Sequence, residues 1–364
     1  CWLTYGSYVE YPSGTLGKFS RTVPDHVVEK NLFRDFAWST SHLKSWKFAI
    51  WEYIDYEESF VETDPIVENN HFYQNGIDNC ADNILVTNGS GIIIRNNLIN
   101  QAAGVGIEAD TYAAGLLITE NTISGNGINL VACGGGVFDD SGIRLKSANA
   151  TIFKNIIHSN QGEGVVVAEN VSGILISQNS IYKNGIRTPS LGIDLDKSRK
   201  NGDGVTLNDN GDVDSGPNGL ENFPFIGGAY IAGNTLILTG WAAPGTTVEV
   251  FFTDINEGTA SAGDNQLGLT QDYGEGQVFI GAAIEGSASD QDGTTSSYLD
   301  DDGNTDTTNK YKFTFPLPPG TVLGELVTTT GTRANSTSEF SPKVEITAYT
   351  VITNRRITYR IKSN

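Results

Sequence analysis

Two acidic and two basic residues stand at equivalent positions of neighbouring sequence repeats. Glu108 and Asp110 follow one Gly-Ile pair, and Arg144 and Lys146 follow the next. If both segments are adjacent strands, the acidic pair lies about 4.8 Å from the basic pair. Lys146 or Arg144 could then abstract a proton next to the carboxylate of a uronate sugar. Ca²⁺ held by Glu108 and Asp110 would neutralise that carboxylate, so this pattern indicates a polysaccharide lyase.

Two other interpretations of these residues remain open. A glycoside hydrolase needs two carboxylates across one cleft, and Glu108 with Asp194 is the pair that this column of residues offers. A surface ladder of ion pairs between adjacent strands would instead contribute only a few tenths of a kcal/mol per pair. Val166 and Ala168 occupy the same column in the next repeat and would interrupt a long polar groove. We therefore favour the ion-pair ladder.

Tryptophan residues concentrate near the start of the chain. Trp38, Trp46 and Trp51 fall in a long insertion between Asp35 and Asp64. Their flat rings could bind substrate by stacking on sugars. The alternative, which we favour, is that the insertion covers the open end of a repetitive fold and prevents edge-to-edge pairing.

A run of Asp, Asn and Gly from residue 192 onward predicts a cation site. Carboxylate and carbonyl oxygens on a Gly-rich backbone suit Ca²⁺, although the spacing is not that of an EF-hand loop. A loop of Asx turns without a metal is the alternative. The candidate ligands are Asp194, Asp196, Asp203, Asp209, Asp212 and Asp214.

The elements that position these residues come from a recurrent hexad. It consists of a β-branched residue, two variable residues, Asn, one variable residue and Ile or Phe. A period of two with β-branched residues predicts short strands, and a repeat of this length predicts a solenoid whose units bury their apolar faces by stacking. The first inward column would be Val28, Val67, Ile94, Ile118, Ile152 and Ile176, and the second Phe33, Phe72, Ile99, Ile123, Ile157 and Ile181.

Two further columns complete each repeat. The Asn of the hexad would sit at a bend and stack into a ladder, and a second Asn follows at residues 75, 126, 160 and 184. A Gly-led strand then closes each coil, at residues 106–109, 142–145, 164–167 and 192–195.

These phrases resemble the right-handed parallel β-helix family, the pectate-lyase-like fold of polysaccharide-active enzymes and many bacterial secreted and surface proteins. The resemblance covers about residues 27–196 and implies the fold, but it says little about activity. The acidic segment from Leu191 to Pro224 resembles the closing segment of bacterial surface β-helix proteins. In those proteins it leads into a bacterial immunoglobulin-like module.

The second half of the chain reads as all-β. Leu236 and Leu238 alternate with polar residues, as do Tyr311 and Phe313, and turn signals separate these runs. We therefore expect an all-β chain in which a right-handed parallel β-helix is followed by an immunoglobulin-like β-sandwich. The expected parts are a first coil or cap with an aromatic-rich insertion (1–66), β-helix coils (67–198), an acidic junction (199–228), the sandwich (229–349) and a basic C-terminal strand or tail (350–364).

Composition narrows the function. A formal net charge of -20 argues against nucleic acid as a partner, and no apolar run is long enough to span a membrane. The chain starts at Cys1 and contains no Met, so we expect a mature form or a fragment. Cys80 and Cys133 follow similar Asn-Gly-Ile phrases, and both a disulfide and two free thiols remain open.

We therefore expect a secreted, extracellular or cell-surface protein with a non-catalytic role in adhesion, a matrix or a filament, or in glycan binding. The expected partners are glycans or other surface and matrix proteins. Open solenoid ends leave self-assembly open. The alternative is a Ca²⁺-dependent polysaccharide lyase, or a glycoside hydrolase, acting on an acidic polysaccharide.

Overall fold

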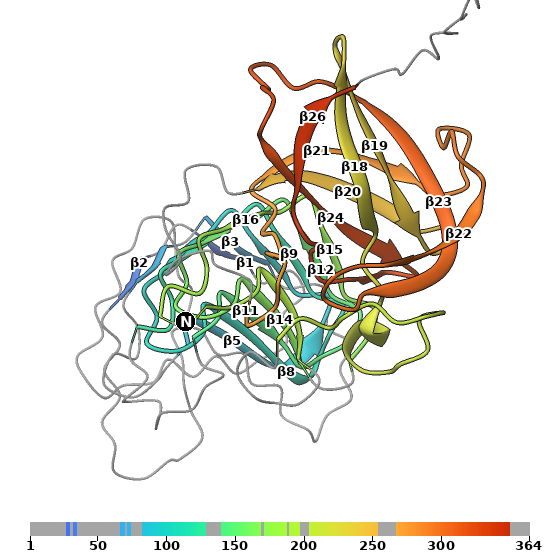
Figure 1. Cartoon of the computed structure of the whole chain (residues 1–364). Helices are drawn as coiled ribbons and strands as arrows, with labels where there is room; N and C mark the ends of the chain where they lie inside the picture. The colour runs from blue at the N-terminus through green and yellow to red at the C-terminus, as the bar shows by residue number, and fades with distance from the viewer. Residues whose placement is uncertain are drawn as a thin grey trace, which may run out of the picture.

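The computed structural model describes residues 27–29, 32–34, 66–69, 71–73, 82–128, 140–168, 171–187, 189–196, 204–253 and 267–349. These residues form two all-β parts, a stack of short parallel strands and a second part built from longer strands (Figure 1). The predicted residues Trp38, Trp46, Trp51, Cys80 and Cys133 lie outside the described residues.

The stacked strands form three parallel sheets. Sheet A has six strands: β1 (Val27–Glu29), β3 (Ile66–Glu68), β6 (Ile93–Arg95), β9 (Leu117–Thr119), β12 (Thr151–Phe153) and β15 (Leu175–Ser177). Sheet B has six: β2 (Leu32–Arg34), β4 (His71–Tyr73), β7 (Leu98–Asn100), β10 (Thr122–Ser124), β13 (Ile156–His158) and β16 (Ser180–Tyr182). Sheet C has five: β5 (Ile84–Ser90), β8 (Ile107–Ala114), β11 (Ile143–Leu145), β14 (Val165–Ala168) and β17 (Ile193–Asp196). One strand from each sheet makes one rung of a parallel β-helix.

Both inward columns predicted from the hexads are confirmed. In sheet A, Ile118 pairs with Ile94 on one side and with Ile152 on the other. In sheet B, Ile123 stands between Ile99 and Ile157 in the same way. These side chains are fully buried and belong to one continuous core. Because the side chains of a strand alternate, this register fixes which residues of each rung face outward.

The Gly-led strands of sheet C are confirmed too, and the structure shows why they begin with Gly. A Cβ atom on Gly142 would lie 2.7 Å from the Gly164 carbonyl oxygen and 2.7 Å from Asn160 Nδ2. No side chain fits there without moving the backbone of the next rung. The chain enters sheet C by passing directly over the Asn ladder, which only Gly allows.

Two Asn ladders hold the bends. The first ladder lies between sheets A and B. The backbone N–H of Asn121 donates to Asn155 Oδ1 at 2.9 Å, and the backbone N–H of Asn155 donates to Asn179 Oδ1 at 2.8 Å. The second ladder includes Asn160, whose Nδ2 donates to Asn184 Oδ1 at 2.8 Å. All of these Asn side chains are buried, so each ladder satisfies backbone groups that the bend leaves without a strand partner.

The residue before each Asn of the first ladder has left-handed backbone geometry, which favours Gly. Glu120 occupies this position with a φ of 55° and an exposed side chain. We expect Glu120→Gly to raise the free energy of unfolding by up to about 1 kcal/mol, because Gly removes the steric cost of this conformation. Chemical denaturation checks this. Thr122→Gly, two residues on in β10, should lower stability instead, and a loss of stability in Glu120→Gly would contradict the prediction.

The second part contains one path of strands in the order β21-β20-β24-β26-β18-β19-β23-β22, with β25 paired to β24. Its first strand starts at Phe225, before the predicted boundary at residue 229. A separate core that includes Val250, Phe313 and Ile346 lies inside it. The strands are β18 (Phe225–Ala232), β19 (Thr235–Ala242), β20 (Thr247–Thr253), β21 (Val278–Ile284), β22 (Thr295–Leu299), β23 (Thr305–Pro316), β24 (Leu326–Arg333), β25 (Ser336–Thr337) and β26 (Val344–Ala348). A 3-10 turn, η1 (Pro217–Leu220), precedes them.

The second part closes the C-terminal end of the β-helix. Three buried glutamates accept hydrogen bonds from the last rung. Glu275 accepts from Asn184 Nδ2 at 2.8 Å, Glu249 from the Gln178 amide N–H at 2.9 Å, and Glu339 from the Leu195 amide N–H at 3.0 Å. The carboxylates replace the partners that another rung would supply.

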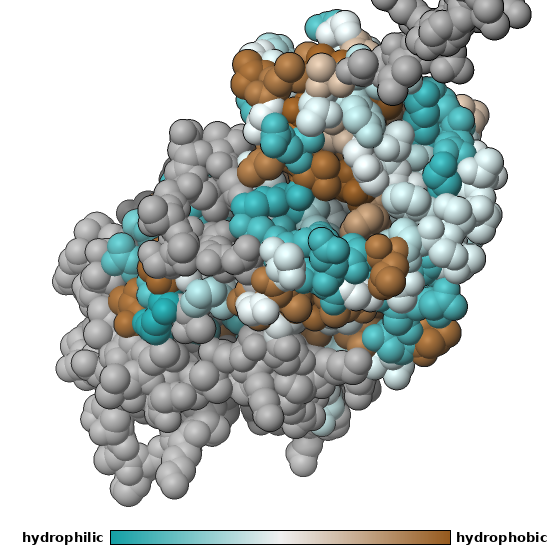
Figure 2. Space-filling model, in the orientation of Figure 1, coloured by the Kyte–Doolittle hydropathy of each residue, from teal (hydrophilic) through white to brown (hydrophobic). Residues whose placement is uncertain are grey.

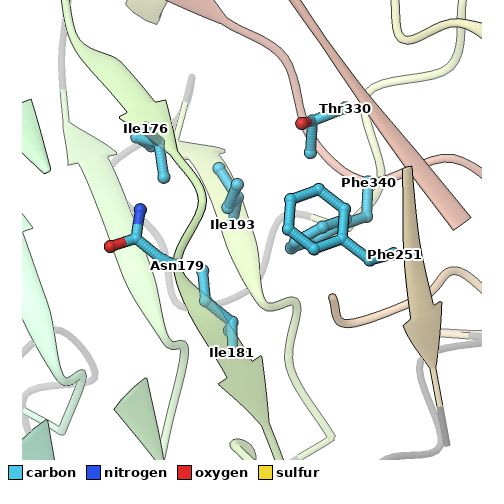
Figure 3. A pocket seen from close by; sticks show the side chains of 7 residues that line it. All are labelled: Ile176, Asn179, Ile181, Ile193, Phe251, Thr330 and Phe340. Atoms are coloured by element: carbon cyan, nitrogen blue, oxygen red, sulfur yellow. The ribbon is translucent and has the colours of Figure 1, made fainter. Parts of the chain in front are cut away.

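Apolar contacts complete this joint. Phe251 and Phe340 of the second part lie over Ile176, Ile181 and Ile193 at the end of the β-helix core (Figure 3). The seam between them leaves no room for a water molecule. The expectation of an open solenoid end is therefore wrong at the C-terminal side, because a domain of the same chain already covers it.

Candidate functional site

The predicted column of charged residues lies on sheet C. Glu108 pairs with Arg144 in the strand register, Arg144 with Val166, and Val166 with Asp194. The order of the column is therefore confirmed, including its interruption by Val166. Its exposure is not, because Glu108, Arg144 and Asp194 are 7%, 9% and 1% exposed. The alternation of side chains along a strand predicts the direction in which each side chain points, but it does not predict whether another segment covers that side chain.

Within this column, Lys146 Nζ forms an ion pair with the Glu108 carboxylate. Asp110 lies nearby on β8, where its carboxylate accepts the Thr111 amide N–H at 2.8 Å. The structure thus brings together the predicted base and the predicted cation ligand, and it joins them to each other. An ammonium group held by a carboxylate of its own chain is the arrangement expected of an ion-pair ladder.

Three of the six predicted metal ligands meet in the junction before β18. Carboxylate oxygens of Asp209, Asp212 and Asp214 lie within 4.8 Å of one another. Asp194 and Asp196 lie on β17 of sheet C, and the group does not include Asp194. Asp203 falls outside the described residues. The acidic run is thus divided between a strand and a loop.

Two residues that the sequence did not indicate complete this acidic group. Arg333 on β24 forms ion pairs with the Asp212 and Glu221 carboxylates, the latter at 3.0 Å. One guanidinium therefore already compensates part of the negative charge. The group joins the junction to the second part of the chain across more than a hundred residues of sequence, which explains why no local motif shows it.

The environment of this group raises the pKa of two of its carboxyls, those of Glu221 and Asp212. Burial and the neighbouring Asp212 raise the pKa of Glu221 to about 7, against the opposing effect of Arg333. Burial also raises the pKa of Asp212. The folded protein therefore retains a proton on Glu221 at a pH at which the unfolded chain has released it.

This difference predicts a pH dependence of stability. Because the pKa of Glu221 rises on folding, the native state binds more protons than the unfolded state between pH 4.5 and about 7. Stability is then lost as the pH rises through this window. We expect Glu221→Gln to flatten the curve of unfolding midpoint against pH in thermal denaturation. The exposed-site variant Glu345→Gln should keep the wild-type slope, and a Glu221→Gln curve as steep as that of the wild type would contradict the assignment.

Sheet B carries a second outward surface, for which we predicted no role from the sequence. Asn100, Ser124, His158 and Tyr182 follow one another in register on successive rungs. The rings of His158 and Tyr182 are stacked, with centroids 4.9 Å apart and planes 8° from parallel. This surface could have been predicted from the sequence, because each of these residues directly follows the inward Ile of its hexad and must therefore point outward.

The second part also exposes apolar residues on its surface. Figure 2 shows apolar and polar residues interspersed over its visible side. The exposed large apolar residues there are scattered, and they include Val278, Leu299, Val322 and Leu323. Scattered apolar residues are normal on a protein surface and do not mark a site. The described residues contain no α-helix long and apolar enough to cross a membrane.

Comparison with known proteins agrees with the stacked architecture. Residues 58–235 match the family model described as a right handed beta helix region. The stacked strands β3 to β17 of the parallel β-helix lie within this segment, and the match extends into β18 and the first residue of β19. None of the curated proteins matches the chain.

Two solved structures of a bacteriophage tailspike protein also match part of the chain at low similarity. One is the enzymatically active domain of tailspike protein 2 of bacteriophage CBA120, with 10% identity and a TM-score of 0.28. It covers 88% of this chain and 64% of its own. The other is full-length tailspike protein 2 from an Escherichia coli O157:H7 bacteriophage, with 11% identity and a TM-score of 0.30. It covers 90% of this chain and 58% of its own, so this chain spans about three fifths of the length of either.

Proposed function

We propose that the chain is an extracellular or cell-surface structural and adhesive protein that binds glycans or matrix proteins without turning them over. The observation that carries this proposal is the Lys146–Glu108 ion pair. The residues with the best chemistry for catalysis are joined to each other, and Glu108 is buried. The second part covers the C-terminal end of the β-helix, and an elongated domain with one covered end suits a structural role.

The test is a search for turnover. The purified chain is incubated with acidic and neutral polysaccharides, and unsaturated products are followed by absorbance while new reducing ends are measured chemically. We expect no product in either assay. Turnover of any of these polymers would overturn the non-catalytic proposal.

The second candidate function is the Ca²⁺-dependent lyase or hydrolase, and the adjacency of Glu108, Arg144 and Lys146 favours it. In that case turnover is observed and Lys146→Ala abolishes it, since the base for proton abstraction is gone. Lys183→Ala, which removes a lysine near sheet B, is the matched control and keeps full activity. Turnover that survives Lys146→Ala would remove the lyase assignment to this site.

We also propose that the second part is an immunoglobulin-like module. The strand order supports this proposal, since β18-β19-β23-β22 corresponds to strands A-B-E-D and β21-β20-β24-β26 to strands C′-C-F-G of that fold. Modules of this kind serve as spacers and binding domains outside the cell. This agrees with the proposed location.

The acidic group is the proposed Ca²⁺ site, with Asp209, Asp212 and Asp214 as ligands. Its oxygens are the hard ligands that Ca²⁺ prefers, and negative charge remains after Arg333 is counted. Added Ca²⁺ should raise the unfolding temperature of the wild type and leave that of Asp209→Asn unchanged. An equal response in both proteins, or none in the wild type, would reject the site.

A further inference from the structure

The outer face of sheet B presents two parallel rows of side chains. On strands β7, β10, β13 and β16 the first row contains Leu98, Thr122, Ile156 and Ser180, and the second contains Asn100, Ser124, His158 and Tyr182. Leu98 and Ile156 are 38% and 43% exposed, and the others are partly exposed. Apolar and hydrogen-bonding groups therefore stand side by side on a flat surface that repeats about every 4.8 Å, the spacing of parallel strands.

This face carries no charged side chain on strands β7, β10, β13 and β16, although the net charge of the chain is -20. On these four strands His158 is the only side chain that can gain a positive charge. Burial and the nearby Lys183 lower its pKa, which keeps the ring neutral at neutral pH. By contrast, the outer face of sheet A includes Arg95, and sheet C carries the Glu108 column.

The two rings are placed for contact with a flat ligand. His158 and Tyr182 stack on each other along the helix axis, and the next residue in the row is the small Ser124. Among the described residues, no second ring therefore lies over the ring face of His158 that points away from Tyr182. Beyond Tyr182 the second part begins, where the Ser180 hydroxyl donates to the Gln277 carbonyl oxygen at 2.6 Å. The face thus has a defined end.

We propose that the outer face of sheet B binds an extended, uncharged polysaccharide that lies along the helix axis with one sugar residue on each rung. The proposal rests on the proposed glycan-binding function and names its site. The rung spacing is close to the length of one sugar residue in an extended chain. Apolar sugar faces would contact Leu98, Ile156 and the His158 ring, while hydroxyl groups would bond to Asn100, Thr122 and Ser124.

Charge decides between the classes of glycan. An acidic polysaccharide would be repelled by a protein of this net charge and would find no cation on the two rows where they cross strands β7, β10, β13 and β16. A protein partner would need a larger apolar centre than these isolated aliphatic groups provide. An uncharged polymer with both apolar faces and hydroxyl groups matches what the face offers.

Affinity electrophoresis in native gels tests the proposal, with glucomannan and hydroxyethylcellulose as neutral probes and polygalacturonate as the acidic probe. We expect the neutral polymers to retard the wild-type chain and polygalacturonate to have no effect. His158→Ala and Tyr182→Ala should each weaken the retardation about tenfold, the scale of a lost aromatic contact. Ser124→Arg should abolish it by placing bulk and charge on the face without removing the stacked rings.

Phe153→Ala is the matched control, because it removes an aromatic ring from the outer face of sheet A and should leave retardation unchanged. Thermal unfolding of each variant shows whether it is folded, and Ser124→Arg keeps the test decisive if an alanine variant is not. Neutral-polymer binding that survives Ser124→Arg, or binding to polygalacturonate alone, would overturn this site while leaving a glycan-binding function intact. If the wild-type chain binds none of the three probes, the site is overturned together with the glycan-binding function.

Discussion

Replacing Glu275 with alanine is expected to lower the free energy of unfolding by about 2–4 kcal/mol. The Glu275 carboxylate is 1% exposed and accepts both the amide N–H of Asn184, at 3.2 Å, and its Nδ2 group, at 2.8 Å. Alanine would leave two buried donors without this acceptor, and each costs about 1–3 kcal/mol. The loss falls at the end of an Asn ladder, so the last rung should open first.

Chemical denaturation measures this loss, and hydrogen exchange locates it. Protection of amides in β16 and β17 should fall more than protection in β10. Glu345→Ala, on the exposed side of β26, is the control and should change stability by less than about 0.5 kcal/mol. An equal effect of the two substitutions would show that the carboxylate does not hold the joint.

A comparable loss, about 3 kcal/mol, is expected for Asn155→Ala in the middle of the first ladder. The Asn155 Oδ1 atom accepts the Asn121 amide N–H at 2.9 Å, and its Nδ2 group donates to the Ile118 carbonyl oxygen at 2.8 Å. Alanine removes both bonds and leaves buried backbone groups of two rungs unsatisfied. Aspartate should cost more than alanine, because it would place a charge in the same buried position.

Equilibrium unfolding in denaturant checks this second prediction. Asn234→Ala, in the exposed turn between β18 and β19, is the matched substitution and should have a small effect. If Asn155→Ala lowered the free energy of unfolding no more than Asn234→Ala does, the prediction that the Asn ladder stabilises the stacked rungs would be wrong.

The stacked fold could be predicted because its signal is local and repeated. The alternation of apolar residues within each hexad predicts a strand, and the recurrence of Ile99, Ile123 and Ile157 predicts the register between rungs. The adjacency of Glu108 and Arg144 followed from the same logic, since adjacent strands place equivalent positions side by side, whereas the ion pair joins Glu108 diagonally to Lys146, two positions beyond Arg144.

The rest could not be predicted because it depends on contacts between distant parts of the chain. Nothing near Glu275 or Glu249 in the sequence indicates that these residues bind a rung formed about ninety and seventy residues earlier. Arg333 joins the acidic group for the same reason. The burial of Arg144 was missed because strand alternation gives direction alone. For the sheet C site, the predicted order of the residues along the column was right, but their predicted exposure to solvent was wrong.

The joint between the two parts has a mechanical consequence. Several short hydrogen bonds and the rings of Phe251 and Phe340 connect the last rung to the second part, so a pull on the far end of that part loads all of them together. The tension then passes into the stack of rungs along its axis, through every backbone ladder at once. A molecule built this way transmits force as a stiff strut, and it should resist stretching until many bonds fail in one step.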